Sequence, residues 1–161
     1  MAEALTMTLD ELIGLDRVFE KLRVADKSAL IAELGRRAGL ALGLPPADIT
    51  ASLAAREILG STGVGGGIAV PHARLEGLPA LAGFFARLAR PIDYAAIDGR
   101  PVDLVFLLLS PTDNHAAHLA ALAAVSRRLR DKSLAATIRG AESSAQIRDC
   151  LTGEGEIRSA G

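Results

Sequence analysis

Residues 56–72 read REILGSTGVGGGIAVPH, and the rest of the chain is organised around this stretch. A helix-type segment ends in a loop that contains Ser61, Thr62 and glycines at positions 60, 63, 65, 66 and 67. Ile68–Val70 then reads as a short β-strand that ends on Pro71-His72. Because glycine adopts backbone conformations that other residues avoid, such a loop allows the backbone to approach a ligand closely. The pattern therefore suits a histidine that accepts an anionic group, although an ordinary turn between helix and strand explains the glycines too.

Segments on both sides of this stretch alternate between helical and β-type patterns. Capping residues and a 3.6-residue apolar period mark the helices, and short apolar runs mark the strands. Strands interleaved with helices predict an α/β fold, a single-domain layered sandwich with helices packed on a mixed sheet. Asp26, Asn114 or Asp113, Ser133 and Ser143 are the predicted helix caps. The predicted helices are 8–13, 27–44, 46–59, 115–130, 133–139 and 144–151, and the predicted strands are 18–19, 68–70, 80–88 and 102–109.

Composition limits the classes of function. The 161 residues carry a net charge of −1 with 3% aromatic residues, so neither a basic surface nor a base-stacking platform indicates nucleic-acid binding. Cys150 is the single cysteine, which excludes an intrachain disulfide. The N-terminus lacks a signal-peptide pattern, and the apolar runs are far shorter than the ~18–20 residues that span a bilayer. We therefore expect a cytoplasmic protein without membrane insertion.

The glycine loop does not match the common nucleotide-binding motifs. A Walker A loop requires Gly-Lys-Ser/Thr, which is absent here. A dinucleotide fingerprint starting at Gly63 or Gly65 would place Ile68 or Val70 at its third glycine. Both motifs also follow a strand, whereas this loop precedes one. The sequence thus predicts an anion site that uses no nucleotide and no other cofactor.

The residue types near this loop are those of phosphoryl chemistry. A neutral imidazole such as His72 is a competent nucleophile near pH 7. His115 and His118 fall in the first turn of the 115–130 helix, where free N–H groups stabilise an anion. Arg56 and Arg74 offer guanidinium groups to phosphate oxygens. The alternatives are a surface or core histidine at 72, a helix-packing histidine at 118, and a solvated charge at 56; His115 has no assigned role.

Three separated motifs resemble one family. They are Arg56-Glu57-x2-Gly60-Ser61-Thr62-Gly63-x-Gly65-x-Gly67-Ile68-Ala69-Val70-Pro71-His72-Ala73-Arg74-Leu75, then Ala96-Ile97-Asp98-Gly99-x-Pro101-Val102-Asp103-Leu104, then His118-Leu119 followed by Ser126-Arg127-Arg128-Leu129. The chain resembles the enzyme IIA domain of the fructose/mannitol/nitrogen class in the bacterial phosphoenolpyruvate-dependent phosphotransferase system. The resemblance covers residues 8–152 and leaves 153–161 as an expected flexible tail. It implies a mixed, about five-stranded sheet flanked by helices.

The resemblance also implies roles for individual residues. His72 would accept a phosphoryl group from a phosphorylated HPr-like protein, so the chain would be a phosphotransferase that acts as a stoichiometric phosphohistidine carrier. His118 would hydrogen-bond the phosphoryl group, and Arg56 would offset its charge. Ser61 and Thr62 would lie in the loop that borders the site.

Within the family the chain looks most like the nitrogen-regulatory branch. That branch implies a free-standing domain, an HPr-like donor of the nitrogen type, and regulated targets such as potassium-transport regulators or stringent-response enzymes. The runner-up is a fructose- or mannitol-type carrier that passes phosphate to a IIB domain. Two hypotheses from other classes remain: a metal site using His72, His115, His118 and Asp113, and a pure interaction module with structural histidines.

Overall fold

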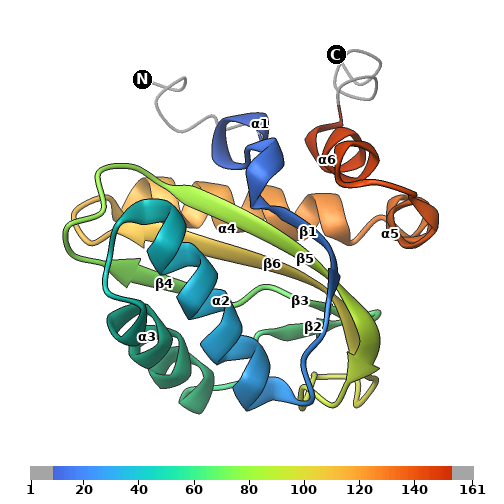
Figure 1. Cartoon of the computed structure of the whole chain (residues 1–161), viewed down its shortest axis with the longest axis horizontal. Coiled ribbons are helices and arrows are strands. Elements are labelled where there is room, and N and C mark those ends of the chain that lie inside the picture. The colour runs from blue at the N-terminus through green and yellow to red at the C-terminus, as the bar shows by residue number, and fades with distance from the viewer. Residues whose placement is uncertain (1–8, 154–161) are drawn as a thin grey trace.

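A computed structural model describes residues 9–153, which form a six-stranded mixed sheet with helices on both faces (Figure 1). The strand order is β1-β5-β6-β3-β2, and β4 pairs with β6 beyond the end of β3. β5 runs antiparallel to its neighbour β6, whereas β1 is parallel to β5, and β3 and β4 are parallel to β6. The strands are β1 (Val18–Leu22), β2 (Gly63–Gly65), β3 (Ile68–Ala69), β4 (His72–Leu75), β5 (Ala82–Ile92) and β6 (Val102–Pro111).

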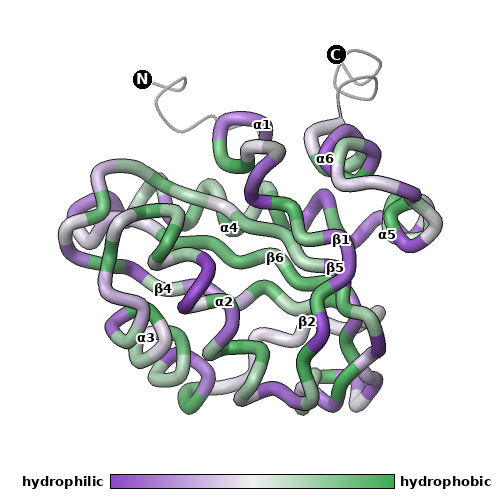
Figure 2. The backbone as a smooth tube through the Cα atoms, in the orientation of Figure 1, coloured by the Kyte–Doolittle hydropathy of each residue, from purple (hydrophilic) through white to green (hydrophobic). Residues whose placement is uncertain are grey.

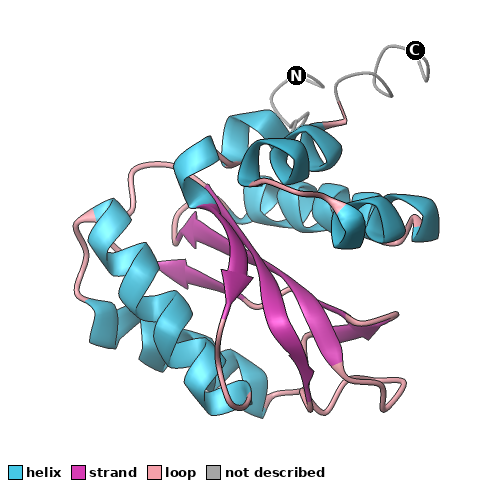
Figure 3. Ribbon diagram, turned by 45° about the vertical axis from the view of Figure 1, so that its right-hand side comes forward, coloured by secondary structure: helices cyan, strands magenta, loops and turns pink. Residues whose placement is uncertain are grey.

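Two layers of helices enclose the sheet, as the turned view in Figure 3 makes clear. One face carries α2 and α3, and the other carries α1, α4, α5 and α6. A 3₁₀ turn, Leu15–Arg17, leads into β1. The helices are α1 (Leu9–Leu12), α2 (Lys27–Leu42), α3 (Pro46–Ile58), α4 (His115–Leu129), α5 (Lys132–Gly140) and α6 (Ser144–Thr152).

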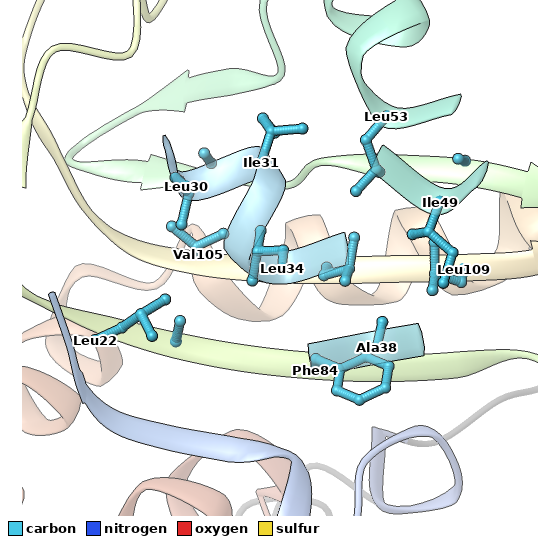
Figure 4. Close-up of a cluster of buried hydrophobic side chains, with 14 of the residues drawn as sticks. Leu22, Leu30, Ile31, Leu34, Ala38, Ile49, Leu53, Phe84, Val105 and Leu109 are labelled. Carbon is cyan, nitrogen blue, oxygen red and sulfur yellow. The ribbon is translucent and has the colours of Figure 1, made fainter. Parts of the chain in front are cut away.

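The central strand β6 explains why the sheet is covered twice. Along it, Val105, Leu107 and Leu109 point into the core under α2 and α3, while the alternate residues Leu104, Phe106 and Leu108 point into the other core. Figure 2 shows β5 and β6 as largely hydrophobic tubes, and Figure 4 shows the first core, with leucines and isoleucines of α2 and α3 against the sheet. Strands buried on both faces read as continuous apolar runs, as predicted for 102–109.

The helix starts follow local capping chemistry. Asp26, Asn114 and Ser143 accept the predicted hydrogen bonds, from the backbone N–H groups of Ala29, Ala117 and Gln146. The cap predicted at Ser133 is wrong by two residues. Asp131 takes that role and accepts from the N–H groups of Ser133 and Leu134.

The sheet has more strands than the sequence patterns indicate. The α/β class is confirmed. The patterns indicate four strands and miss β2 and β4, and the resulting six strands compare with the roughly five that the resemblance implies. The strand expected at 80–88 begins at Ala82 and continues to Ile92. Thr8, at the start of the predicted domain, and residues 154–161 of the predicted tail lie outside the described residues.

The glycine run forms a hairpin turn between β2 and β3. Gly65, Gly66 and Gly67 have φ of 101°, 67° and 82°, a region that favours glycine. The Gly66 N–H donates to Asp98 at 3.0 Å, and the Gly66 carbonyl accepts from Arg139 at 2.9 Å. This turn lies at the opposite end of β3 from His72, so these three glycines form a turn between two strands rather than the helix-to-strand turn that the sequence left open.

Candidate functional site

His72 is the first residue of β4 and lies beside Leu108 of β6. Its Nδ1 is 2.8 Å from the carbonyl oxygen of Val70, and its Nε2 is 3.2 Å from Nε of Arg56. A carbonyl only accepts and a guanidinium only donates, so Nδ1 carries the proton and Nε2 has the free electron pair. The two contacts therefore fix the tautomer of His72, with Nε2 as its nucleophilic atom.

The surroundings of His72 keep the ring neutral. Burial lowers its pKa below the ordinary value of 6.5, and the positive charge of Arg56 lowers it further. The Val70 carbonyl and the Glu57 carboxylate oppose this shift without reversing it. Since only the neutral ring is nucleophilic, the site holds His72 in its reactive form at pH 7.

Arg56 lies in the last turn of α3, where the helix meets the glycine loop. Its Nη1 donates to the carbonyl of Gly60 at 2.8 Å, while its Nε donates to His72. The first bond anchors the guanidinium to the loop. The second can transfer to an oxygen of a phosphoryl group once the Nε2 electron pair is used to bond phosphorus.

Glu57 ties this loop to the rest of the fold. Its carboxylate accepts from the N–H of Thr62 at 3.1 Å, from the Thr62 hydroxyl, and from the Tyr94 hydroxyl at 3.1 Å. Lys27, at the start of α2, forms an ion pair with it at 2.9 Å. Burial raises the pKa of Glu57, but the hydrogen bonds from Thr62 and Lys27 outweigh it and hold the pKa below its usual value. The neighbour of Arg56 is thus a buried charge with complete partners.

Sequence reasoning missed Tyr94 and Lys27 in this network. Tyr94 is the one tyrosine of the chain and is fully buried, and the Lys27 ammonium lies 4.3 Å from its ring centre. A buried tyrosine requires a partner for its hydroxyl, and that requirement is the only sequence signal that pointed here. Its partner is 37 positions away, which no local pattern reveals.

Ser61 and Thr62 have partners inside the protein. The Ser61 hydroxyl donates to the Tyr94 carbonyl at 3.2 Å and accepts from the N–H of Gly63 at 3.1 Å. The Thr62 hydroxyl contacts Glu57 and the Tyr94 hydroxyl. Neither residue lines the pocket at His72. In this structure both hydroxyls shape the loop whose Gly60 carbonyl anchors Arg56.

His118 lies across from His72, one turn into α4. The ring centres are 5.5 Å apart and the planes are tilted by 50°. His118 Nδ1 is 2.7 Å from Oγ of Ser110, at the end of β6. Burial lowers the pKa of His118 to about 4, and electrostatic interactions with His72, Arg74 and His115 act in the same direction. His118 is therefore neutral at pH 7 and has one N–H to donate.

An open pocket of about 660 Å³ connects these groups. Arg56, His72 and His118 line it together with Arg74 and His115, whose Nη1 and Nδ1 are 3.1 Å apart. Exposed leucines contribute to its wall, namely Leu59 and Leu119. The structure thus brings together the predicted residues 56, 72 and 118 and adds His115, to which the sequence assigned no role.

The described residues contain neither a cluster of metal ligands nor a membrane-spanning helix. Among residues 9–153, no three His, Cys, Asp or Glu side chains are placed to hold a metal ion, so the metal hypothesis gains no support. Within the same range, no helix is both long and apolar enough to cross a membrane.

The sequence and the fold of the chain match a defined class of phosphotransferase domain. Residues 11–153 match the family model of the phosphoenolpyruvate-dependent sugar phosphotransferase system, EIIA 2. The chain belongs to this family, whose members are phosphoryl carriers.

Its relatives favour one branch. The chain is 40% identical over 145 residues to a nitrogen regulatory protein of Bradyrhizobium diazoefficiens, covering 90% of this chain and 95% of the relative. The crystal structure of nitrogen regulatory protein IIA-Ntr from Neisseria meningitidis matches with a TM-score of 0.86 and 34% identity, over 89% of this chain and 99% of that one. The IIA mannitol structure of Escherichia coli, at 20% identity and a TM-score of 0.72 over 86% of this chain and 98% of that one, shares the fold. This is a IIA-type protein most similar to the nitrogen regulatory group.

Proposed function

We propose that Nε2 of His72 accepts a phosphoryl group from a phosphohistidine on an HPr-like protein. The observation that carries the proposal is the pair of contacts at His72, which leave Nε2 as the unprotonated nitrogen beside Arg56. The ring is neutral at pH 7, so it needs no base to remove a proton before attack.

The transfer balances without a cofactor. As the Nε2 electron pair forms the new P–N bond, the P–N bond of the donor breaks and its electron pair returns to the donor imidazole. Little covalent work is required, so positioning and charge stabilisation dominate. Arg56 supplies N–H donors and positive charge on one side, and an N–H of His118 faces the group from the other.

Labelled phosphoryl transfer tests the acceptor. The native chain, incubated with a phosphorylated HPr-like protein, is expected to carry label that peptide mapping assigns to His72. The variant His72→Ala is expected to take up none, because no other group in the pocket is fixed as a nucleophile. The matched control is His115→Ala, which removes a histidine of the same pocket and is expected to keep the label. Label on His115 in the native protein would refute the assignment.

We propose further that the phosphoryl group is a regulatory signal, as the similarity to nitrogen regulatory proteins favours. Phosphorylation adds about −1.5 to −2 charges. It does so in a pocket with an apolar wall, which includes Leu59 at 83% exposure. Partners that bury this wall are therefore expected to distinguish the two states. Potassium-transport regulators and stringent-response enzymes are the candidate targets.

A pull-down with unphosphorylated and phosphorylated protein in parallel tests this role. A target retained by one state only would support it, and equal retention by both states and by His72→Ala would favour a pure interaction module. The second candidate within the family is onward transfer to a IIB domain, which the shared fold with IIA mannitol favours. Loss of label to an added IIB domain would support that candidate.

A further inference from the structure

Ser110 is a polar residue in an apolar strand. It lies near the end of β6, where the run Leu104–Leu109 is apolar throughout, and its side chain is completely buried. A buried hydroxyl without a partner destabilises a fold, so its position has to be explained by what it contacts. Its one hydrogen-bond partner among the described residues is Nδ1 of His118, at 2.7 Å.

The direction of this bond follows from the hydrogens available. If Nδ1 of His118 carried the proton and donated to Ser110, the buried hydroxyl hydrogen of Ser110 would have no acceptor among the described residues. If Ser110 donates to Nδ1, that hydrogen is used and only a lone pair of Oγ stays unused. An unused lone pair costs less than an unused buried donor. The hydroxyl therefore donates, and the proton of neutral His118 resides on Nε2.

We propose that Ser110 is a positioning residue that fixes His118 in the Nε2–H tautomer, so that this N–H faces a phosphoryl group on His72. The inference deepens the proposed function and rests on it. With the opposite tautomer, His118 would present a lone pair to the phosphoryl oxygens and repel them. His118 is neutral at pH 7, so its ring has a single N–H. The nitrogen that carries this N–H decides whether the ring attracts or repels the phosphoryl oxygens.

The same logic applies to both histidines of the pocket. The Val70 carbonyl accepts from Nδ1 of His72 and frees Nε2 as a nucleophile. The Ser110 hydroxyl donates to Nδ1 of His118 and makes Nε2 a donor. One ring nitrogen of each histidine is used to set the chemical role of the other nitrogen.

Nitrogen NMR of the unphosphorylated full chain tests the tautomer directly. We expect native His118 to show a protonated Nε2 and an unprotonated Nδ1 at pH 7, and Ser110→Ala to shift His118 toward a mixture of tautomers. The control is Thr137→Ala, which removes an exposed hydroxyl bonded to the carbonyl of Ser133 and is expected to change neither ring. A native His118 protonated on Nδ1, or an unchanged tautomer in Ser110→Ala, overturns the proposal.

Transfer kinetics test whether the tautomer of His118 affects phosphoryl transfer to His72. Ser110→Ala is expected to slow phosphoryl transfer to His72 by about tenfold, the effect of losing one hydrogen bond. In a His118→Ala background, the same substitution is expected to have no further effect, because Ser110 acts through His118. An equal loss in both backgrounds contradicts the proposal. The NMR result does not depend on transfer, so failure of the proposed function and failure of this inference are distinguishable.

Discussion

The two sides of His72 are built on different physical principles. On the α3 side, Arg56 is half-buried and charged, and a second charge, Glu57, is held beside it by Lys27, Thr62 and Tyr94. On the α4 side, His118 is buried and neutral, and among the described residues its ring is hydrogen-bonded to the Ser110 hydroxyl. The half-buried α3 side therefore acts through charge, and the buried α4 side acts through orientation. Each prediction below changes one side and leaves the other intact.

The largest effect is expected from Arg56→Gln. Removing a charged donor aimed at the transferring group is expected to slow phosphoryl transfer by about 10²–10³-fold. It also removes a positive charge that lowers the pKa of His72, so that pKa is expected to rise. Transfer kinetics and an NMR titration of His72 measure the two effects. Arg56→Lys, which keeps the charge without the planar fork, should fall between the native protein and Arg56→Gln. If Arg56→Gln transfers phosphate as fast as the native protein, the positive charge that stabilises the transferring group comes from another residue.

The neutral side is expected to control the pH dependence of stability. The pKa of His118 is about 4 in the folded chain and about 6.5 when unfolded, so between these values the unfolded state binds more protons. The contribution of His118 to the free energy of unfolding is therefore at its maximum above pH 6.5. It falls as the pH drops toward 4, by an amount on the order of 2–3 kcal/mol. Urea unfolding across this window measures the loss. His118→Gln should flatten the slope; the same slope in both proteins would exclude His118 as its source.

Glu57→Gln tests whether the charged side is also structural. The substitution leaves the partly buried ammonium of Lys27 without its counter-ion and weakens the bonds of Thr62 and Tyr94, so we expect destabilisation by about 2 kcal/mol. Urea unfolding at pH 7 provides the measurement. Glu33→Gln is the matched control, since Glu33 pairs with Arg36 and Arg37 on the helix surface, where such pairs contribute about 0–1 kcal/mol. Equal losses would mean that burial does not distinguish the two carboxylates.

The smallest effect separates the two nitrogens of His118. Glutamine places an N–H near the position of Nε2, whereas asparagine places one near Nδ1. We expect His118→Gln to transfer phosphate about tenfold faster than His118→Asn, the value of one hydrogen bond to the transferring group. Single-turnover transfer from the HPr-like donor measures the ratio. Two variants of equal rate would show that the α4 side contributes no directed donor.

The sequence predicted those parts of the fold that depend on local patterns. The apolar run of β6 and the caps at Asp26, Asn114 and Ser143 are local, and the structure confirms them. The strand β4 was missed because its four residues include His72 and Arg74, and it becomes a strand only by pairing with β6.

In the candidate site, too, features that depend on distant contacts could not be predicted from the sequence. The family resemblance assigned roles to Arg56, His72 and His118, and the structure brings all three into one pocket. The sequence did not reveal that the glycine turn is held by Asp98 and Arg139, more than thirty positions away. The sequence also did not reveal a role for Ser110. This residue follows an apolar run, and its role depends on the contact with His118 of α4.

The acceptor that selects the reactive nitrogen of His72 is a main-chain carbonyl. Every amino acid at position 70 supplies the same oxygen, so replacement of that side chain does not change which nitrogen of His72 keeps the free electron pair. The path of the backbone therefore determines the tautomer of His72. An engineer who wishes to move the phosphoryl group to Nδ1 would have to redirect the chain between β3 and β4, since no single side-chain exchange at position 70 removes the constraint.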